Sequence, residues 1–290
     1  MSQQPLENSR RTQIFMGATD DFGAARAVIY GAPMDWTASY RPGSRLGPAR
    51  IREASYGIET FSWNSGRELF EVSFYDAGDL DLPFGNVQSS LETIRQAAGK
   101  LVAAGKIPIG LGGEHLVSLA MIEPVYRACP DLAVIHFDAH ADLREDYYGE
   151  ELSHATVMRR VASLLGPKNI FQAGIRSGTR QEYDYAVANT NLLRVPILEA
   201  VDRMLSLLAG RPVYITLDVD VVDPAYAPGT GTPEPGGCTS GEILEAVRRL
   251  GSGLNLVGLD LVEVLPAHDL SERTVILAAK ILREVILSFA

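Results

Sequence analysis

The sequence has few cysteines and no excess of positive charge. Cys129 and Cys238 are the two cysteines among 290 residues, and they lie too far apart to form a metal-binding or redox motif. We expect both to be free thiols in a reducing cytoplasm. The formal net charge of −10 argues against nucleic acid as the main partner and is compatible with a cationic substrate.

Long apolar runs are also scarce. Residues 1–13 contain no apolar stretch of the kind that a signal peptide needs. The longest apolar segment, residues 274–290, is short for a membrane span and is interrupted by Lys280, Arg283 and Glu284. We therefore expect a helix that is buried on most sides, in a cytoplasmic protein with no membrane partner.

The composition, 46% apolar and 21% charged, is typical of a globular protein large enough to bury a full core. No linker, charge block or repeat divides the chain, so we expect one domain over residues 1–290, with about residues 1–20 as a polar extension. Seven short, β-branched segments are predicted strands: 27–30, 72–76, 107–111, 133–137, 170–174, 213–217 and 256–259. Several are apolar throughout, as in strands covered on both faces.

Helices are predicted between these strands. Residues 89–105 place Leu91, Ile94 and Leu101 on one face, begin with serine and stop at Gly105. Residues 240–251 follow the same plan, with Ser240 as a possible N-cap. Pro48 suits the first turn of a helix that stops near Gly57. This alternation predicts an α/β fold, with a parallel sheet covered by helices on both faces.

Three predicted strands end in polar clusters. His115 follows residues 107–111, Asp218 and Asp220 follow residues 213–217, and Asp138, His140 and Asp142 follow residues 133–137. Alternate residues of an extended chain point to the same side, so each cluster can converge near its strand end. His136, inside the strand, is expected to point away and to have a structural role.

A single aspartate at a strand end is ordinarily a turn or cap residue, but four together need positive charge. Two carboxylates 4 Å apart repel by about 4 kcal/mol at an effective dielectric constant of about 20. Two divalent cations would neutralise the four aspartates. Carboxylates and imidazoles without thiolate favour Mn²⁺ over Zn²⁺, and some carboxylates must bridge the ions.

The segments GGEH, DAHAD and LDVDVVDPAYAPGTGTPEPGG resemble the three signatures of the ureohydrolases, the arginase and agmatinase family. Their order and spacing match from about Ala27 to the C-terminus. The resemblance implies a three-layer α/β/α sandwich with a central, mainly parallel eight-stranded sheet. It also implies two Mn²⁺ ions per subunit and a homo-oligomer, either a trimer or a hexamer.

The same resemblance assigns roles to single residues. One ion would bind His115, Asp138, Asp142 and Asp218, and the other would bind Asp138, His140, Asp218 and Asp220. Asp138 and Asp218 would then bridge the ions, and Asp142 would also orient the attacking water. His154 matches the family's proton-shuttling histidine, and Glu263 matches the glutamate that holds the guanidinium by paired hydrogen bonds.

The resemblance favours agmatine as the substrate, cleaved to putrescine and urea. Arginase-type members typically carry asparagine where this chain has Arg144, and the acidic loop of residues 145–151 would favour a substrate with an amine tail. Arg144 leaves open a carboxylate-bearing guanidino compound such as guanidinobutyrate, and guanidinopropionate or arginine are further alternatives. The sequence gives less support to two other functions, those of a catalytically silent metal-binding paralogue and of a two-metal phosphoesterase.

Overall fold

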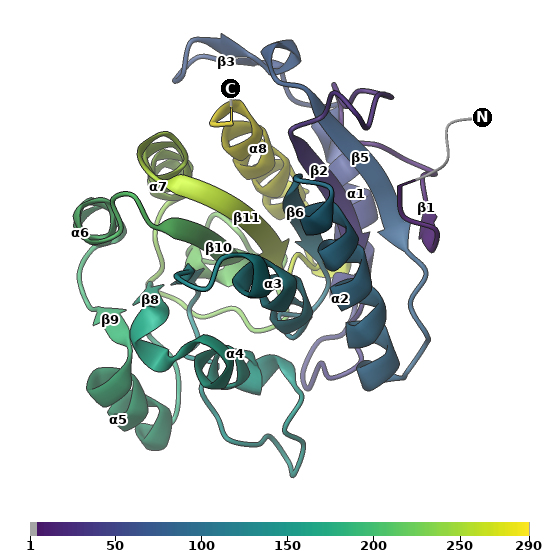
Figure 1. Cartoon of the computed structure of the whole chain (residues 1–290). Helices are drawn as coiled ribbons and strands as arrows, with labels where there is room; N and C mark the ends of the chain where they lie inside the picture. The colour runs from purple at the N-terminus through teal and green to yellow at the C-terminus, as the bar shows by residue number, and fades with distance from the viewer. Residues whose placement is uncertain (1–4, 290) are drawn as a thin grey trace.

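A computed structural model describes residues 5–289, which form one large sheet between two layers of helices and a separate two-stranded hairpin (Figure 1). The strands are β1 (Ser9–Arg10), β2 (Ala27–Ala32), β3 (Phe61–Ser62), β4 (Arg67–Glu68), β5 (Phe74–Leu80), β6 (Ile107–Gly112), β7 (Ala133–Phe137), β8 (Ile170–Ala173), β9 (Asn191–Leu193), β10 (Pro212–Asp218) and β11 (Asn255–Val262). The helices are α1 (Gly47–Ser55), α2 (Val87–Ala103), α3 (Val117–Ala128), α4 (Val157–Leu165), α5 (Arg180–Asn189), α6 (Ile197–Leu207), α7 (Ser240–Gly253) and α8 (Arg273–Leu287).

The large sheet has the strand order β1-β5-β2-β6-β11-β10-β7-β8-β9. Its last eight members are parallel, which confirms the expected eight-stranded parallel core. A ninth strand, β1, joins the edge in the antiparallel direction and pairs Ser9 with Leu80. The sequence did not indicate β1 or the short strand β9.

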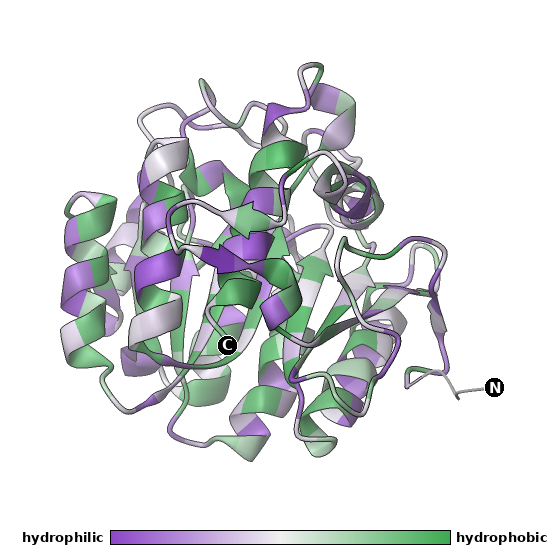
Figure 2. Cartoon of the chain, turned by 90° about the horizontal axis from the view of Figure 1, so that it is seen from above, coloured by the Kyte–Doolittle hydropathy of each residue, from purple (hydrophilic) through white to green (hydrophobic). Residues whose placement is uncertain are grey.

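The helices cover both faces of the sheet, so the three-layer α/β/α architecture is confirmed. Helices α1, α6, α7 and α8 pack together on one face, and α2, α3 and α4 pack on the other. Each face buries its own apolar cluster against the strands. Figure 2 shows apolar residues along the interior strands and hydrophilic residues on the outer helices. Strands buried on both sides explain the continuous apolar runs in the sequence.

Two helix starts differ from the sequence prediction by one to three residues. Helix α2 is capped by Asn86, whose side chain accepts the Ser89 amide at 3.0 Å. Helix α7 is capped by Thr239 rather than Ser240, because Thr239 and Glu242 accept each other's backbone amides in a capping box. A reciprocal pair satisfies two unpaired donors, which a lone serine cannot do.

Strand β5 continues four residues beyond the predicted end at Asp76. Aspartate and glycine disfavour strands, which is why residues 77–80 were not predicted as strand. In the structure, Arg52 of α1 pairs with the carboxylates of Asp76 and Asp79, so their charges are compensated inside the fold. A contact between distant segments therefore overrides the local preference.

The two ends of the chain pack onto the sheet as far as they are described. Phe15 is fully buried in the core, within the segment expected to be a polar extension; residues 1–4 of that segment lie outside the described residues. Helix α8 is buried along most of its length, as expected, and Ala290 lies outside the described residues. Within residues 5–289, no helix is long and apolar enough to cross a bilayer. Cys129 and Cys238 are both free thiols.

Replacing Arg52 with methionine is expected to lower the free energy of unfolding by about 3–5 kcal/mol, because it leaves the buried Asp76 carboxylate without a counter-charge. The Arg52 side chain is 1% exposed, and its Nε donates to Asp76 at 2.8 Å. Denaturant unfolding measures the loss. Arg50→Met on the same helix is the control, since the 38% exposed Arg50 forms only surface ion pairs and should cost less than about 1 kcal/mol. Equal losses in the two variants would contradict the prediction.

Candidate metal centre and active site

The predicted site residues lie at one edge of the sheet because its strands are parallel. His115 follows β6, Asp138 follows β7, Asp218 ends β10 and Glu263 follows β11. In the sheet these four strands are consecutive, in the order β6-β11-β10-β7. Their carboxyl ends therefore open into one crevice, the usual ligand position in such sheets.

All six predicted ligand side chains lie within one linked cluster. His115 Nδ1 lies 3.0 Å from Asp138 Oδ2, 3.2 Å from Asp142 Oδ2 and 3.5 Å from Asp218 Oδ2. His140 Nδ1 lies 2.9 Å from Asp220 Oδ2 and 3.5 Å from Asp138 Oδ1. Asp138 thus lies between the two histidines.

Backbone amides hold three of the carboxylates in place. Asp138 Oδ1 accepts the amide of His140 at 2.5 Å, Asp218 Oδ1 accepts that of Asp220 at 2.8 Å, and Asp220 Oδ1 accepts that of Ala139 at 2.9 Å. In each carboxylate the Oδ2 atom faces a histidine ring, and Asp138 Oδ1 also lies 3.5 Å from His140 Nδ1. The local turns after β7 and β10 therefore fix which oxygens face the centre.

Two site residues have left-handed backbones that L-residues rarely adopt. The φ angles are 53° at Asp142 and 61° at Glu263. The Asp142 carbonyl accepts the amides of Met158 and Arg159 at the start of α4, and the Glu263 amide donates to the Gly113 carbonyl at 2.8 Å. Such strain persists only where surrounding contacts impose it, and it is concentrated at functional sites.

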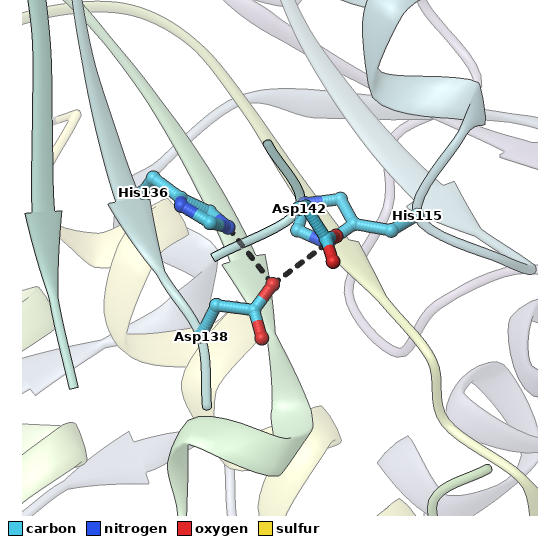
Figure 3. Close-up of side chains that lie close together, drawn as sticks. All are labelled: His115, His136, Asp138 and Asp142. Atoms are coloured by element: carbon cyan, nitrogen blue, oxygen red, sulfur yellow. Dashed lines mark hydrogen bonds and ion pairs between the residues drawn. The ribbon is translucent and has the colours of Figure 1, made fainter. Parts of the chain in front are cut away.

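The orientation expected for His136 is wrong. Its Nε2 lies 2.8 Å from Asp138 Oδ2, and Figure 3 shows the two side chains pointing toward each other. Positions 136 and 138 have the same parity, so they face the same side of the extended chain. Gln172 Nε2 lies 3.1 Å from the other ring nitrogen, which buries His136 as a support for Asp138.

The hydrogen bonds of His115 fit a cation. The Thr216 hydroxyl donates to Asp260 Oδ1 at 2.7 Å, so it can only accept from His115 Nε2, which lies 2.9 Å away. A neutral imidazole with its proton on Nε2 has a lone pair on Nδ1. That buried Nδ1 makes no hydrogen bond although three carboxylates surround it, and Asp220 Oδ2 is also a buried atom without one. A lone pair aimed at carboxylate oxygens is the arrangement of a metal ligand.

The pKa values of the acidic side chains also indicate a need for positive charge. Burial, followed by the charge of Asp138, raises the pKa of Asp142 to about 7. Burial and neighbouring aspartates likewise raise the pKa of Asp218 and Asp220. Their protein surroundings alone therefore do not stabilise all the carboxylates in the charged form, and divalent cations would do so. The cluster is suited to binding metal.

A cavity of about 300 Å³ opens beside this cluster. Four predicted ligands line it, together with His154, Glu263, Ser39, Tyr147 and Glu182. Glu263 Oε1 accepts the amide of His115 at 2.8 Å, and burial followed by repulsion from Glu114 raises the Glu263 pKa to about 8. Burial lowers the pKa of His154 to about 4. Glu263 and His154 therefore border the same cavity as the predicted metal centre.

Arg144 lines this cavity. The sequence alone did not decide whether its side chain faces the site. Its Nε lies 3.6 Å from Glu182 Oε2, and its guanidinium lies over the Tyr147 ring. The acidic side chains of residues 145–151 have other surroundings. Glu145 pairs with Arg159, Glu151 pairs with Arg160, and the four acids line two neighbouring cavities. The acidity of this loop is thus no direct argument for an amine tail.

Several residues at the site were not indicated by the sequence. Thr37 and Glu114 contact each other, and Thr37 also contacts His154. Thr216 and Asp260 support His115 from inside the sheet. Glu114 stands next to His115 in the GGEH segment and could have been suspected for that reason, whereas Thr37 gave no signal because threonine is ordinary in a loop.

Comparisons with known proteins show which family the chain belongs to. Residues 25–288 match the Arginase family. The chain is 52% identical to the "Agmatinase" of Bacillus cereus over 279 residues, 96% of each chain. It is 38% identical to the human "Guanidino acid hydrolase, mitochondrial" over 272 residues, 90% of this chain and 77% of that protein. A crystal structure of a putative agmatinase from Clostridium difficile is 37% identical, with a TM-score of 0.89 over 93% of this chain and 99% of that one. The chain therefore belongs to the arginase family, the ureohydrolases.

Proposed function

We propose that this enzyme hydrolyses agmatine to putrescine and urea, as a step of putrescine and polyamine biosynthesis, with two Mn²⁺ ions per subunit. The observation that supports this most directly is the meeting of three sets of residues at one cavity. These are the cluster of six predicted ligands, four of which line the cavity, His154 as a proton carrier and Glu263 as a carboxylate for a guanidinium. The name of the Bacillus cereus relative supports agmatine in particular.

The family resemblance supplies the two ligand sets, and the contacts around His115 and His140 support them. His115, Asp138, Asp142 and Asp218 would hold one ion, and Asp138, His140, Asp218 and Asp220 would hold the other. Oxygen and imidazole ligands without thiolate favour Mn²⁺ among the first-row ions. A bound pair of divalent cations would supply Lewis-acid activation of water near neutral pH.

The protein's own groups would bind and orient the substrate. Glu263 Oε2 remains free to accept guanidinium N–H groups, because the His115 amide occupies one position on Oε1. Planar carboxylate and guanidinium groups pair through two parallel hydrogen bonds. Asp142 would orient the attacking water, and His154 would deliver the proton that the leaving amine requires.

A guanidino acid is the second candidate substrate, and Arg144 is the observation that favours it. Arg144 lines the cavity, and Glu182, its nearest acidic partner, is already occupied by the amides of Leu143 and Thr179. A substrate carboxylate could therefore pair with Arg144. The name of the human relative, a guanidino acid hydrolase, also supports a guanidino acid, although its identity to this chain is lower, at 38%.

Urea release should be measured after Mn²⁺ loading with agmatine, arginine, guanidinobutyrate and guanidinopropionate. We expect agmatine to have a kcat/KM at least about tenfold above the others, since one lost favourable contact of about 1.4 kcal/mol is a factor of ten. A guanidino acid turned over faster would reverse the substrate assignment. Hydrolysis of none of them, or faster hydrolysis of a phosphate ester, would contradict the proposed function itself.

We also propose a cytoplasmic homo-oligomer, a trimer or hexamer, that acts on a small cationic guanidino substrate and has no nucleic-acid or membrane partner. The β3–β4 hairpin and the turn after it lie near the top of Figure 1. They support assembly because aromatic side chains in them are exposed. Trp63 is 89% exposed and Phe70 is 68% exposed. Clustered exposed aromatics are typical of protein interfaces. The two free cysteines are compatible with a reducing compartment.

A further inference from the structure

Five polar side chains form a line from the mouth of the cavity into the fold. Tyr147 Oη donates to Ser39 Oγ at 3.3 Å, and Ser39 Oγ lies 3.4 Å from His154 Nε2. On the other side of the ring, His154 Nδ1 lies 3.4 Å from Thr37 Oγ1. Thr37 contacts the buried Glu114, which is fully shielded from solvent. The imidazole is thus held between two hydroxyl groups.

The inner end of this line sets the direction of its hydrogen bonds. Glu114 Oε2 accepts both the amide of Thr37, at 2.9 Å, and the Thr37 hydroxyl proton. A threonine hydroxyl has one proton, so Thr37 Oγ1 can only accept from other partners. It already accepts the His154 amide at 3.0 Å. The ring nitrogen facing it, Nδ1, must therefore carry a proton to form a hydrogen bond.

The contacts at the outer end of the line, with Ser39 and Tyr147, also place the His154 proton on Nδ1. Because Tyr147 donates to Ser39, the Ser39 hydroxyl is free to give its own proton to His154 Nε2. An Nε2 that accepts a hydrogen bond has a lone pair and no proton. Burial lowers the pKa of His154 to about 4, which keeps the resting ring neutral with one N–H. Both ends place that single proton on Nδ1.

We propose that Thr37 and Glu114 are positioning residues that fix His154 as the Nδ1–H tautomer, so that Nε2 is the nitrogen that exchanges protons with the reaction. This inference rests on the proposed function only in taking His154 as the proton carrier of guanidine hydrolysis. Water adds to the guanidinium carbon and gives one proton to Nε2. The bond from carbon to the leaving nitrogen then breaks, its electron pair stays on that nitrogen, and Nε2 returns the proton to it. The added oxygen becomes the carbonyl of urea, and its remaining proton ends on the released amine, which leaves as an ammonium group. The ring ends neutral, still protonated on Nδ1.

The first test compares Thr37→Val with Thr37→Ser in the Mn²⁺-loaded enzyme. Valine keeps the shape and the backbone bond to Glu114 but removes the acceptor for Nδ1–H. We expect kcat to fall about 10- to 100-fold in the valine variant, with KM changed less than about twofold, because general acid–base catalysis contributes about 10²–10⁴ and only its alignment is lost. Serine should restore kcat to within about threefold. Thr93→Val, on α2, is the matched control because Thr93 Oγ1 bonds only the Ser89 carbonyl of its own helix.

The second test determines the tautomer of His154 by NMR and does not depend on catalytic activity. Long-range ¹H–¹⁵N spectra of the ¹⁵N-histidine enzyme loaded with diamagnetic Zn²⁺ contain the signals of five histidine rings. The signals that disappear in His154→Gln are those of His154. We expect protonated Nδ1 and bare Nε2 in the wild type, and a mixture or reversal in Thr37→Val. Protonated Nε2 in the wild type, or full kcat with an unchanged tautomer in Thr37→Val, would overturn the inference. If agmatine is not a substrate, the proposed function fails separately, because the spectra still report the tautomer.

Discussion

Asp138→Asn should lower the rate of urea release by at least about 10³-fold. Metal ions supply several kcal/mol of transition-state stabilisation, and each 1.4 kcal/mol or so is a factor of ten. Asp138 has a central position, since its Oδ2 lies 3.0 Å from His115 Nδ1 and its Oδ1 lies 3.5 Å from His140 Nδ1. Asparagine would replace one of these oxygens by an amide and remove the negative charge shared by both proposed ion sites.

Metal analysis distinguishes this explanation from a general loss of structure. We expect the bound Mn²⁺ to fall from about two ions per chain to one or fewer, while the secondary structure is retained. Asp202→Asn is the matched control, because Asp202 is 63% exposed and pairs with Arg249 on the surface. The control should keep full activity and full metal content. An Asp138→Asn enzyme with wild-type metal content and turnover would place the reaction elsewhere.

Glu263→Gln is the second substitution with a large expected effect, about 10²- to 10³-fold on kcat/KM. Removing one partner of a buried, hydrogen-bonded charge pair costs about 2–5 kcal/mol, much of it from the charge left unpaired. In this enzyme the unpaired charge would be the guanidinium of the substrate. Glutamine also presents N–H groups to a partner that has only donors, so one of the paired hydrogen bonds is lost.

The two substitutions should differ in their effect on metal. Glu263 accepts the His115 amide rather than a ring nitrogen, and glutamine can still accept it, so Glu263→Gln should keep its Mn²⁺. Steady-state kinetics with agmatine and metal analysis of the same preparation measure both effects. Glu199→Gln, whose side chain is half exposed and pairs with Arg203, is the control. Loss of metal together with activity would mean that Glu263 supports the centre instead of binding the substrate.

Local sequence was sufficient for the strands that carry the metal cluster. The strand 133–137 was predicted with its observed bounds, because a run that is apolar except for His136 is either a strand or part of a buried helix, and five residues are too few for a helix. Period-two geometry then placed Asp138, His140 and Asp142 together. The same rule, applied consistently, would have placed His136 beside Asp138. Positions 136 and 138 have the same parity, so the extended backbone alone places both side chains on one side of the strand.

Elements held by distant contacts were less predictable. The end of β5 depends on Arg52, 24 residues away from Asp76 along the chain, and the short strands β1 and β9 depend on neighbours already in the sheet. Burial of Phe15 is a similar case, because the polar residues around it indicated an exposed extension. The strand preferences of single residues do not include the energy that a segment gains by pairing with the edge of a sheet that has already formed.

His154 and Glu263 were named only because the motifs resemble a known family. Chemistry alone would have left each as a single polar residue in a loop. The sequence by itself determined seven strands of the large sheet, that they are parallel, and that four aspartates and two histidines leave the same edge of the sheet. Only the tertiary structure decided that Thr37 lies between the His154 ring and Glu114 and that Arg144 lines the cavity. The direction of each side chain along a strand is fixed by the alternation of neighbouring residues. A loop side chain, in contrast, is oriented by partners that are remote in sequence and become neighbours only when the sheet has formed.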